Sequence, residues 1–204
     1  MTGPRGPPGS LVIRSGWWTE MFKRNRDSGA VAVETALVTG LLLLIVLGAF
    51  EYGMAFRSWF GLTASSREGA RVGASVGPIE GADCAILEAA AAALSSTSAN
   101  EVVNIRIFQH PEATGTPSSL YRPAEGDIED GEILRCENWF LTTSNAWTET
   151  DRDNTGDDRD WLGVEVTYEH AWITGFLFWN GTVQWSNDSV MRLEPLSYGA
   201  IPPP

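Results

Sequence analysis

The longest apolar segment of the chain covers residues 30–50 and has no polar face. It reads AVAVETALVTGLLLLIVLGAF, with Glu34 as its one charged residue. As a helix it would span roughly 30 Å, which is the thickness of one bilayer core. A helix that is apolar all round is buried either in a membrane or in the core of a soluble protein. The absence of a polar face favours the membrane, and we expect a transmembrane helix over residues 30–52.

A cleavable signal peptide is the main alternative to a retained transmembrane helix. Such a peptide has a short apolar region followed by small residues at its cleavage site. The sequences Ala-Phe-Glu-Tyr and Gly-Met-Ala-Phe at the end of the apolar segment match that site poorly. The helical pattern also continues past them, which argues against removal of the segment at this point.

The helix is predicted to extend beyond the membrane over residues 53–77. No proline occurs in this stretch, and Gly77-Pro78 ends the pattern. One stripe of the extension has helical spacing and consists of Tyr52, Phe56, Trp59 and Thr63. Small residues would allow a neighbouring helix to approach closely, namely Gly53, Ala64, Ser65, Ala70, Gly73 and Ala74.

Residues 78–204 change to short alternating segments, which predict an α+β domain. The Ala-rich segment 83–95 predicts a second helix. Residues 110–130 contain three prolines and predict a polar loop. The segment 172–179 (WITGFLFW) is apolar but too short to span a membrane. Candidate strands of one antiparallel sheet are residues 101–109, 133–141, 162–170, 181–185 and 189–193.

Charge is distributed unevenly along the chain. The 14 Lys+Arg and 26 Asp+Glu give a formal net charge of −12. Residues 1–29 carry +3, which leaves −15 for residues 30–204. Basic residues beside a transmembrane helix stay in the cytoplasm, so the N-terminus is predicted inside and the acidic domain outside. The acidic balance excludes nucleic-acid binding through a broad basic surface, and nine Trp exclude a wholly disordered chain.

The junction before the apolar segment has a distinctive order of residues. Residues 23–29 read KRNRDSG, and AVAVE follows, so a basic leader ends in Gly29 and an acid stands at the fifth position of the apolar helix. This order resembles the type IV prepilin (class III) signal. The resemblance implies that a membrane-embedded prepilin peptidase cuts between Gly29 and Ala30 on the cytoplasmic side, and that the apolar helix is kept for assembly.

The position of Glu34 fits such a cut. A charged side chain in hydrocarbon costs about 2.5–3.5 kcal/mol and is rarely placed there without a partner. Cleavage would create a cationic amine on Ala30, one helical turn from Glu34. The carboxylate could pair with its own terminus or, as in pilins, with that of the next subunit. The alternative is an interfacial carboxylate that the helix dipole favours.

A second motif narrows the resemblance. It consists of Arg67, Glu68, Gly69, Ala70 and Arg71. Arg67 and Arg71 share a helix face, and Glu68 can pair with Arg71, which indicates either a solvated face or a subunit contact. Together with the junction and the apolar segment, this motif looks like the TadE-like pseudopilins of the tight-adherence (Flp-type) pilus system. The match covers about residues 26–76, and residues 189–195 resemble the C-terminus of actinobacterial members more weakly.

The resemblance implies a non-enzymatic pseudopilin or minor pilin-like subunit that takes part in tight-adherence pilus biogenesis and cell adhesion. The expected partners are prepilin peptidase, other pilin or pseudopilin subunits, the pilus assembly platform with its ATPase, and membrane lipid. The protein would cross the cell membrane once, with a cytoplasmic N-terminus and an extracytoplasmic C-terminal domain. The rival hypothesis is a single-span membrane-anchored binding protein that never enters a pilus.

The leader is long for this family. Residues 1–20 are rich in Gly and Pro and show no periodicity, whereas Met21 begins a compact basic leader, MFKRNRDSG. We expect either that translation starts at Met21 or that residues 1–20 form a disordered tail. A detected peptide from residues 6–14 would exclude the first option.

The two cysteines, Cys84 and Cys136, fall on the predicted extracytoplasmic side, where disulfides persist. A bridge between them would contribute roughly 4 kcal/mol in the chain-entropy model. The alternative is two free buried thiols.

Catalytic and metal-binding motifs are weak throughout the chain. We expect no cofactor, because the sequence has no phosphate loop, no Gly-x-Ser-x-Gly and no zinc-spaced Cys and His. The nearest candidate is a weak Ca²⁺ loop made of Asp151, Asp153, Thr155 and Asp157. Leu162 stands where a calcium loop has its bidentate Glu, so a solvated acidic loop is the preferred interpretation.

Overall fold

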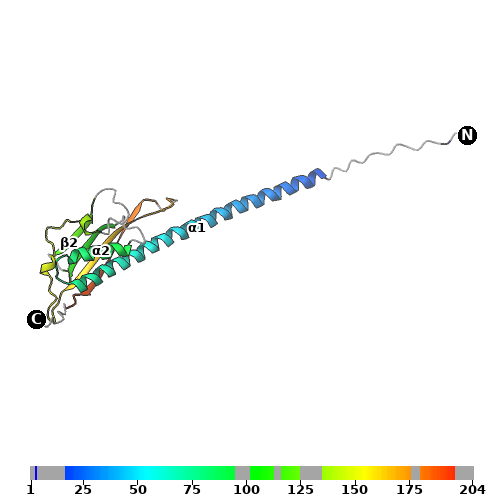
Figure 1. Ribbon diagram of the computed structural model, residues 1–204. Coiled ribbons are helices and arrows are strands. Elements are labelled where there is room, and N and C mark those ends of the chain that lie inside the picture. The colour runs from blue at the N-terminus through cyan, green and yellow to red at the C-terminus, as the bar shows by residue number, and fades with distance from the viewer. Residues whose placement is uncertain are drawn as a thin grey trace. The chain divides into compact units, whose positions relative to one another are not determined.

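The computed structural model describes residue 3 and residues 17–94, 102–112, 116–124, 135–175 and 180–195. The chain divides into two compact units, Met1–Ala49 and Phe50–Pro204. The long helix α1, Trp17–Val76, belongs to both units (Figure 1).

The first unit contains the apolar part of α1. Every side chain from residue 29 to residue 46 is exposed, although most of them are hydrophobic. Within the described part of the chain, Gly29–Val76 is long and apolar enough to cross a membrane. The long apolar N-terminal helix is therefore confirmed. It begins at Trp17, before the predicted start at Ala30, because residues 17–28 contain no Gly or Pro to interrupt it. Residues 1–2 and 4–16 of the leader lie outside the described residues.

The second unit is built on a five-stranded antiparallel sheet with the order β3-β2-β1-β4-β5. The strands are β1 Val102–His110, β2 Ser118–Pro123, β3 Trp139–Leu141, β4 Trp161–Ala171 and β5 Thr182–Arg192. The second helix, α2, runs over Ala82–Leu94, and two short 3₁₀ helices are η3 Cys136–Asn138 and η4 Glu149–Asp151. This arrangement confirms the predicted α+β class and the antiparallel sheet.

Three predictions for the sheet need correction. The expected loop 110–130 contains β2, whose backbone pairs with both β1 and β3. Of the expected strand 133–141, residues 133–134 lie outside the described residues, and within 135–141 η3 precedes a strand reduced to β3. The two strands predicted near the C-terminus are one strand, β5. The polar residues in the middle of β5 pair residue by residue with β4, so tertiary pairing outweighs their low strand propensity.

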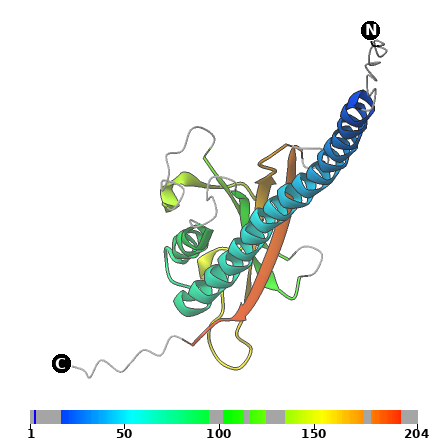
Figure 2. The same ribbon diagram turned by 90° about the vertical axis from the view of Figure 1, so that its right-hand side faces the viewer.

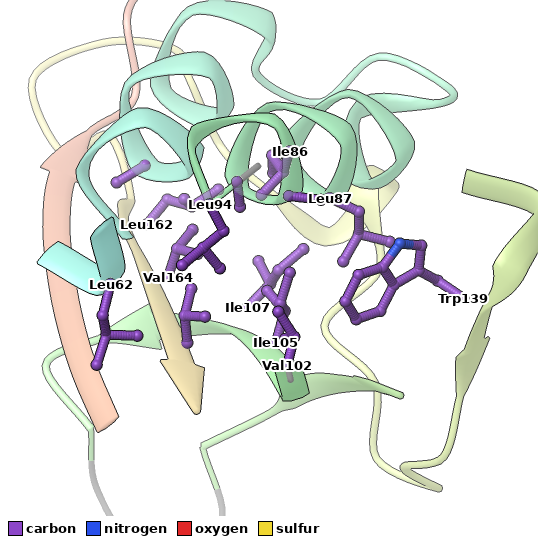
Figure 3. Packing of buried hydrophobic residues seen from close by; sticks show 14 of the residues in the cluster. Leu62, Ile86, Leu87, Leu94, Val102, Ile105, Ile107, Trp139, Leu162 and Val164 are labelled. Atoms are coloured by element: carbon purple, nitrogen blue, oxygen red, sulfur yellow. The ribbon is translucent and has the colours of Figure 1, made fainter. Parts of the chain in front are cut away.

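The core of the second unit lies between one face of the sheet and two helices. The C-terminal half of α1 and α2 cover this face (Figure 2). Alternate residues of β4 point toward the helices, as the period of a strand requires. Figure 3 shows the packed side chains at close range. Fully buried members include Leu62 from α1, Ile86, Leu87 and Leu94 from α2, Ile105 and Ile107 from β1, and Leu162 and Val164 from β4.

Two glycines let α1 approach its neighbours closely. A Cβ at Gly69 would lie 3.1 Å from Val164 and 3.2 Å from Ala90. A Cβ at Gly73 would lie 2.8 Å from Leu162 and 2.9 Å from Ile86. A side chain at Gly73 therefore requires a shift of α2 or β4.

Helix α1 ends where the sequence predicted. Gly77 has a φ of +63°, a left-handed conformation that glycine adopts without a Cβ penalty, and its N–H donates to the carbonyl of Gly73 at 3.1 Å. Pro78 follows and cannot continue the helix.

A buried polar network fixes the start of α2 against the loop that contains η4. The side chain of Arg152 is fully buried, forms an ion pair with Asp83, and lies 5.0 Å from the ring centre of Trp147. The Tyr121 hydroxyl donates to the other oxygen of Asp83 at 2.5 Å. Burial, followed by this hydrogen bond, raises the pKa of Tyr121. Glu149 accepts a hydrogen bond from the backbone N–H of Asp83 at 3.1 Å.

A disulfide lies at the same helix. Cys84 of α2 is bonded to Cys136 at the start of η3, with their Cα atoms 5.0 Å apart. It links α2 to the segment that leads into the edge strand β3.

Candidate membrane and assembly site

The predicted cleavage junction lies in the exposed part of α1. Gly29 and Ala30 are exposed, and a Cβ at Gly29 would meet no other atom within 4 Å. Glu34 is also exposed and lies one helical turn after Ala30. No charged residue follows Glu34 until Glu51, so its carboxylate is the single charge in the apolar segment.

The motif Arg67–Arg71 is divided between two faces of α1. Arg67 and Arg71 are exposed, and Arg71 forms the predicted ion pair with Glu68 at 2.5 Å. Gly69 and Ala70 are buried, with Gly69 close to α2 and β4. The small residues of this motif therefore serve packing inside the domain, and an exposed ion pair of this kind contributes about 0–1 kcal/mol.

A buried carboxylate that the sequence did not reveal lies at the start of the second unit. Glu51 has 0% exposure, and it accepts hydrogen bonds from the backbone N–H groups of Ile173, at 3.2 Å, and Thr174. A buried carboxylate is tolerated when it accepts such bonds. Glu51 thereby holds the segment after β4 against α1.

Five aromatic side chains gather beside Glu51, and we call them the aromatic patch. They are Tyr52, Phe56, Trp59, Trp172 and Trp185. The rings of Tyr52 and Trp172 meet edge to face at 6.4 Å, and those of Trp59 and Trp185 at 6.1 Å. With Ala55 the patch lines an apolar hollow of about 290 Å³. The predicted stripe on α1 is therefore extended by two tryptophans from a distant part of the sequence.

The buried side chain of His170 contacts both tryptophans that the aromatic patch receives from outside α1. Its ring stacks on Trp185 at 5.1 Å and meets the edge of Trp172 at 5.2 Å. Ser58 Oγ lies 3.2 Å from its Nδ1. Ser58 and His170 are 5% and 4% exposed, and neither is among the residues that line the hollow. The pair therefore positions the two tryptophans, and a nucleophile and base are not its best interpretation.

The weak calcium candidate is dispersed in the structure. Asp151 accepts hydrogen bonds from Thr148 and caps η4, whereas Asp153 accepts from the backbone and the hydroxyl of Thr155 at 2.8 and 2.6 Å. These two bonds lower the pKa of Asp153, the one from the hydroxyl first. Across residues 135–175 and the other described ranges, no three His, Cys, Asp or Glu side chains are grouped so that they could hold a metal ion.

Among the described residues, one N-terminal helix is long and apolar enough to span a membrane, which is consistent with the class of single-pass membrane proteins. Residues 29–71 match the family model described as TadE-like protein. This range includes Gly29, Glu34 and the motif Arg67–Arg71, so the resemblance drawn from these residues is confirmed. No curated protein and no solved structure matches the chain significantly.

The matched family suggests a general role. TadE-like proteins are pilus-associated structural proteins, and the family is not an enzyme family. The match and the candidate membrane helix together fit a membrane protein associated with a Tad pilus, and the family context suggests other pilus components as partners.

Proposed function

We propose that this chain is a pseudopilin or minor pilin-like subunit that a prepilin peptidase cuts between Gly29 and Ala30. The TadE-like match carries the proposal, because it begins at Gly29, the residue that would end the leader. The exposure of this junction and the open space around Gly29 support access by a peptidase. The basic leader would hold the N-terminus in the cytoplasm, and the acidic domain would face outward.

Glu34 would set the register of assembly. It lies one helical turn from the amine that cleavage creates on Ala30, in a segment with no other charge. In an apolar medium the attraction between an amine and a carboxylate is only weakly screened. A subunit whose N-terminal amine pairs with Glu34 of a neighbour is therefore more stable in the filament than a subunit shifted along the helix axis, which would leave Glu34 unpaired. The proposed partners are therefore prepilin peptidase, other pilin or pseudopilin subunits, and the assembly platform with its ATPase. Through them the protein would contribute to building an adhesive tight-adherence pilus.

A glycine substitution at the junction tests this function. We expect Gly29→Val to abolish cleavage and piliation, since a peptidase that recognises glycine before the cut would reject a β-branched side chain. Immunoblotting of membranes shows whether the leader is retained, and electron microscopy of the cells shows whether pili form. Gly40→Val is the matched control, because Gly40 also has open space around it but lies within the apolar segment. Normal processing and piliation of Gly29→Val would refute the proposal, whereas an uncut wild-type chain would favour the simple membrane anchor.

A further inference from the structure

The exposed surface of α1 stays apolar beyond the end of the apolar segment. Tyr52, Phe56, Trp59 and Phe60 are all exposed, at 54%, 60%, 39% and 69%. Glu51 is the only carboxylate between Glu34 and Glu68, and it is fully buried with its oxygens bonded to backbone N–H groups. The fold therefore removes from this surface the one negative charge that would keep it away from lipid.

The part of the aromatic patch that begins with Tyr52 lies at the level of the lipid headgroup layer. If the hydrocarbon core ends near Phe50, Tyr52 lies about 3 Å and Phe56 about 9 Å further along the helix axis. The headgroup layer on each side of the core is roughly 5–8 Å thick, and helix tilt lowers both heights above it. Trp172 contacts Tyr52 and lies at its level, whereas Trp185 contacts Trp59, which lies about 14 Å beyond Phe50 and therefore above the layer.

The residue types in the patch favour lipid over a second copy of the chain. Trp and Tyr are enriched at membrane interfaces, where an apolar ring and a polar edge are both accommodated. Helices that associate in a membrane use small residues for close approach, whereas this surface carries large aromatic side chains. Arg57, exposed beside Phe56, adds a cation of the kind that lipid phosphates attract.

We propose that the aromatic patch binds the lipid surface, so that the globular domain makes a membrane contact of its own. The side chains of Tyr52, Phe56 and Trp172 enter the headgroup layer, and those of Trp59 and Trp185 lie above it. Glu51 and His170 hold the segment after β4 so that Trp172 reaches this layer. This inference rests on the single-span anchoring in the proposed function and adds a second membrane contact, made by the domain itself.

Photo-crosslinking of the full-length chain tests the contact. The full chain is reconstituted in vesicles of phosphatidylethanolamine and phosphatidylglycerol, and benzoylphenylalanine is placed at one exposed position at a time. Phe56, in the patch, and Ile173, beside Trp172, are 60% and 55% exposed. Phe140 on the opposite edge strand β3 and Trp161 at the opposite end of β4 are matched controls, at 56% and 46%. Leu42 in the apolar segment reports membrane insertion.

We expect lipid adducts, detected by mass spectrometry, at Phe56 and Ile173 but only background at Phe140 and Trp161. Lipid adducts at Leu42 without adducts at Phe56 and Ile173 would overturn the inference and leave the anchor intact. Adducts between two copies of the chain at Phe56 and Ile173, in place of lipid, would overturn it in favour of a subunit interface. Absence of lipid adducts at Leu42 as well would contradict the membrane anchor and with it the proposed function.

Discussion

Replacing Asp83 with alanine is expected to lower the free energy of unfolding by about 3–5 kcal/mol. Arg152 is fully buried and forms its ion pair with Asp83, so the substitution would leave a buried cation without a counter-charge. The hydroxyl of Tyr121 would lose its acceptor in the same change. The large effect reflects the cost of the unpaired groups that remain, which exceeds the net contribution of the intact network.

Urea unfolding of the full-length protein in detergent, followed by tryptophan fluorescence, measures this loss. The buried Trp147 lies over Arg152 and reports directly on the network. Glu80→Ala is the control, since Glu80 is an exposed acid in the turn before α2. We expect that control to change the free energy of unfolding by less than about 0.5 kcal/mol. An equal, small effect of both substitutions would mean that Asp83 does not compensate a buried charge.

Gly73→Val is the second substitution with a large expected effect. Its Cβ would lie within 3 Å of side-chain atoms of both Leu162 and Ile86, which are fully buried and have little room to move. Overpacking of this kind costs about 1–3 kcal/mol, because side chains must leave their rotamers or the backbone must shift. We therefore expect α1 to separate slightly from α2 and β4 and the domain to become less stable.

The same residue change elsewhere in α1 separates overpacking from helix propensity. A Cβ at Gly53 would meet no other atom within 4 Å, so Gly53→Val keeps the propensity change and removes the clash. The difference between the two urea midpoints gives the packing effect. A Gly73→Val variant as stable as Gly53→Val would show that the close contact of α1 with Leu162 and Ile86 is not maintained in solution.

The features that could be predicted from the sequence depend on neighbouring residues. The apolar segment, the Gly77-Pro78 break and the Ala-rich α2 carry their signals within a few residues, and β1 and β4 show clear alternation. Strands β2 and β5 were missed or divided because their polar residues have low strand propensity. They are strands because β1 and β4 offer them long complementary edges, which a local pattern cannot reveal.

The residues of the candidate site likewise fall into two groups, those that the local sequence indicates and those that only the fold brings together. Gly29, Glu34 and Arg67–Arg71 are short motifs and could be recognised directly. The aromatic patch joins residues 52–59 to Trp172 and Trp185, and the burial of Glu51 depends on backbone groups more than a hundred residues away. Only the pairing of β4 with β5 beside α1 brings these parts together. The aromatic stripe on α1 was predicted correctly from its helical spacing. Nothing in the sequence indicated that Trp172 and Trp185 would lie against it.

The first residue of the mature chain decides whether the protein is processed as a pilin. Intact-mass spectrometry and N-terminal sequencing of the protein purified from membranes of its own cells would determine it. We predict a chain that begins at Ala30 and retains the whole apolar segment with Glu34. A chain that keeps its basic leader, or one that begins beyond residue 50, would contradict the proposed function.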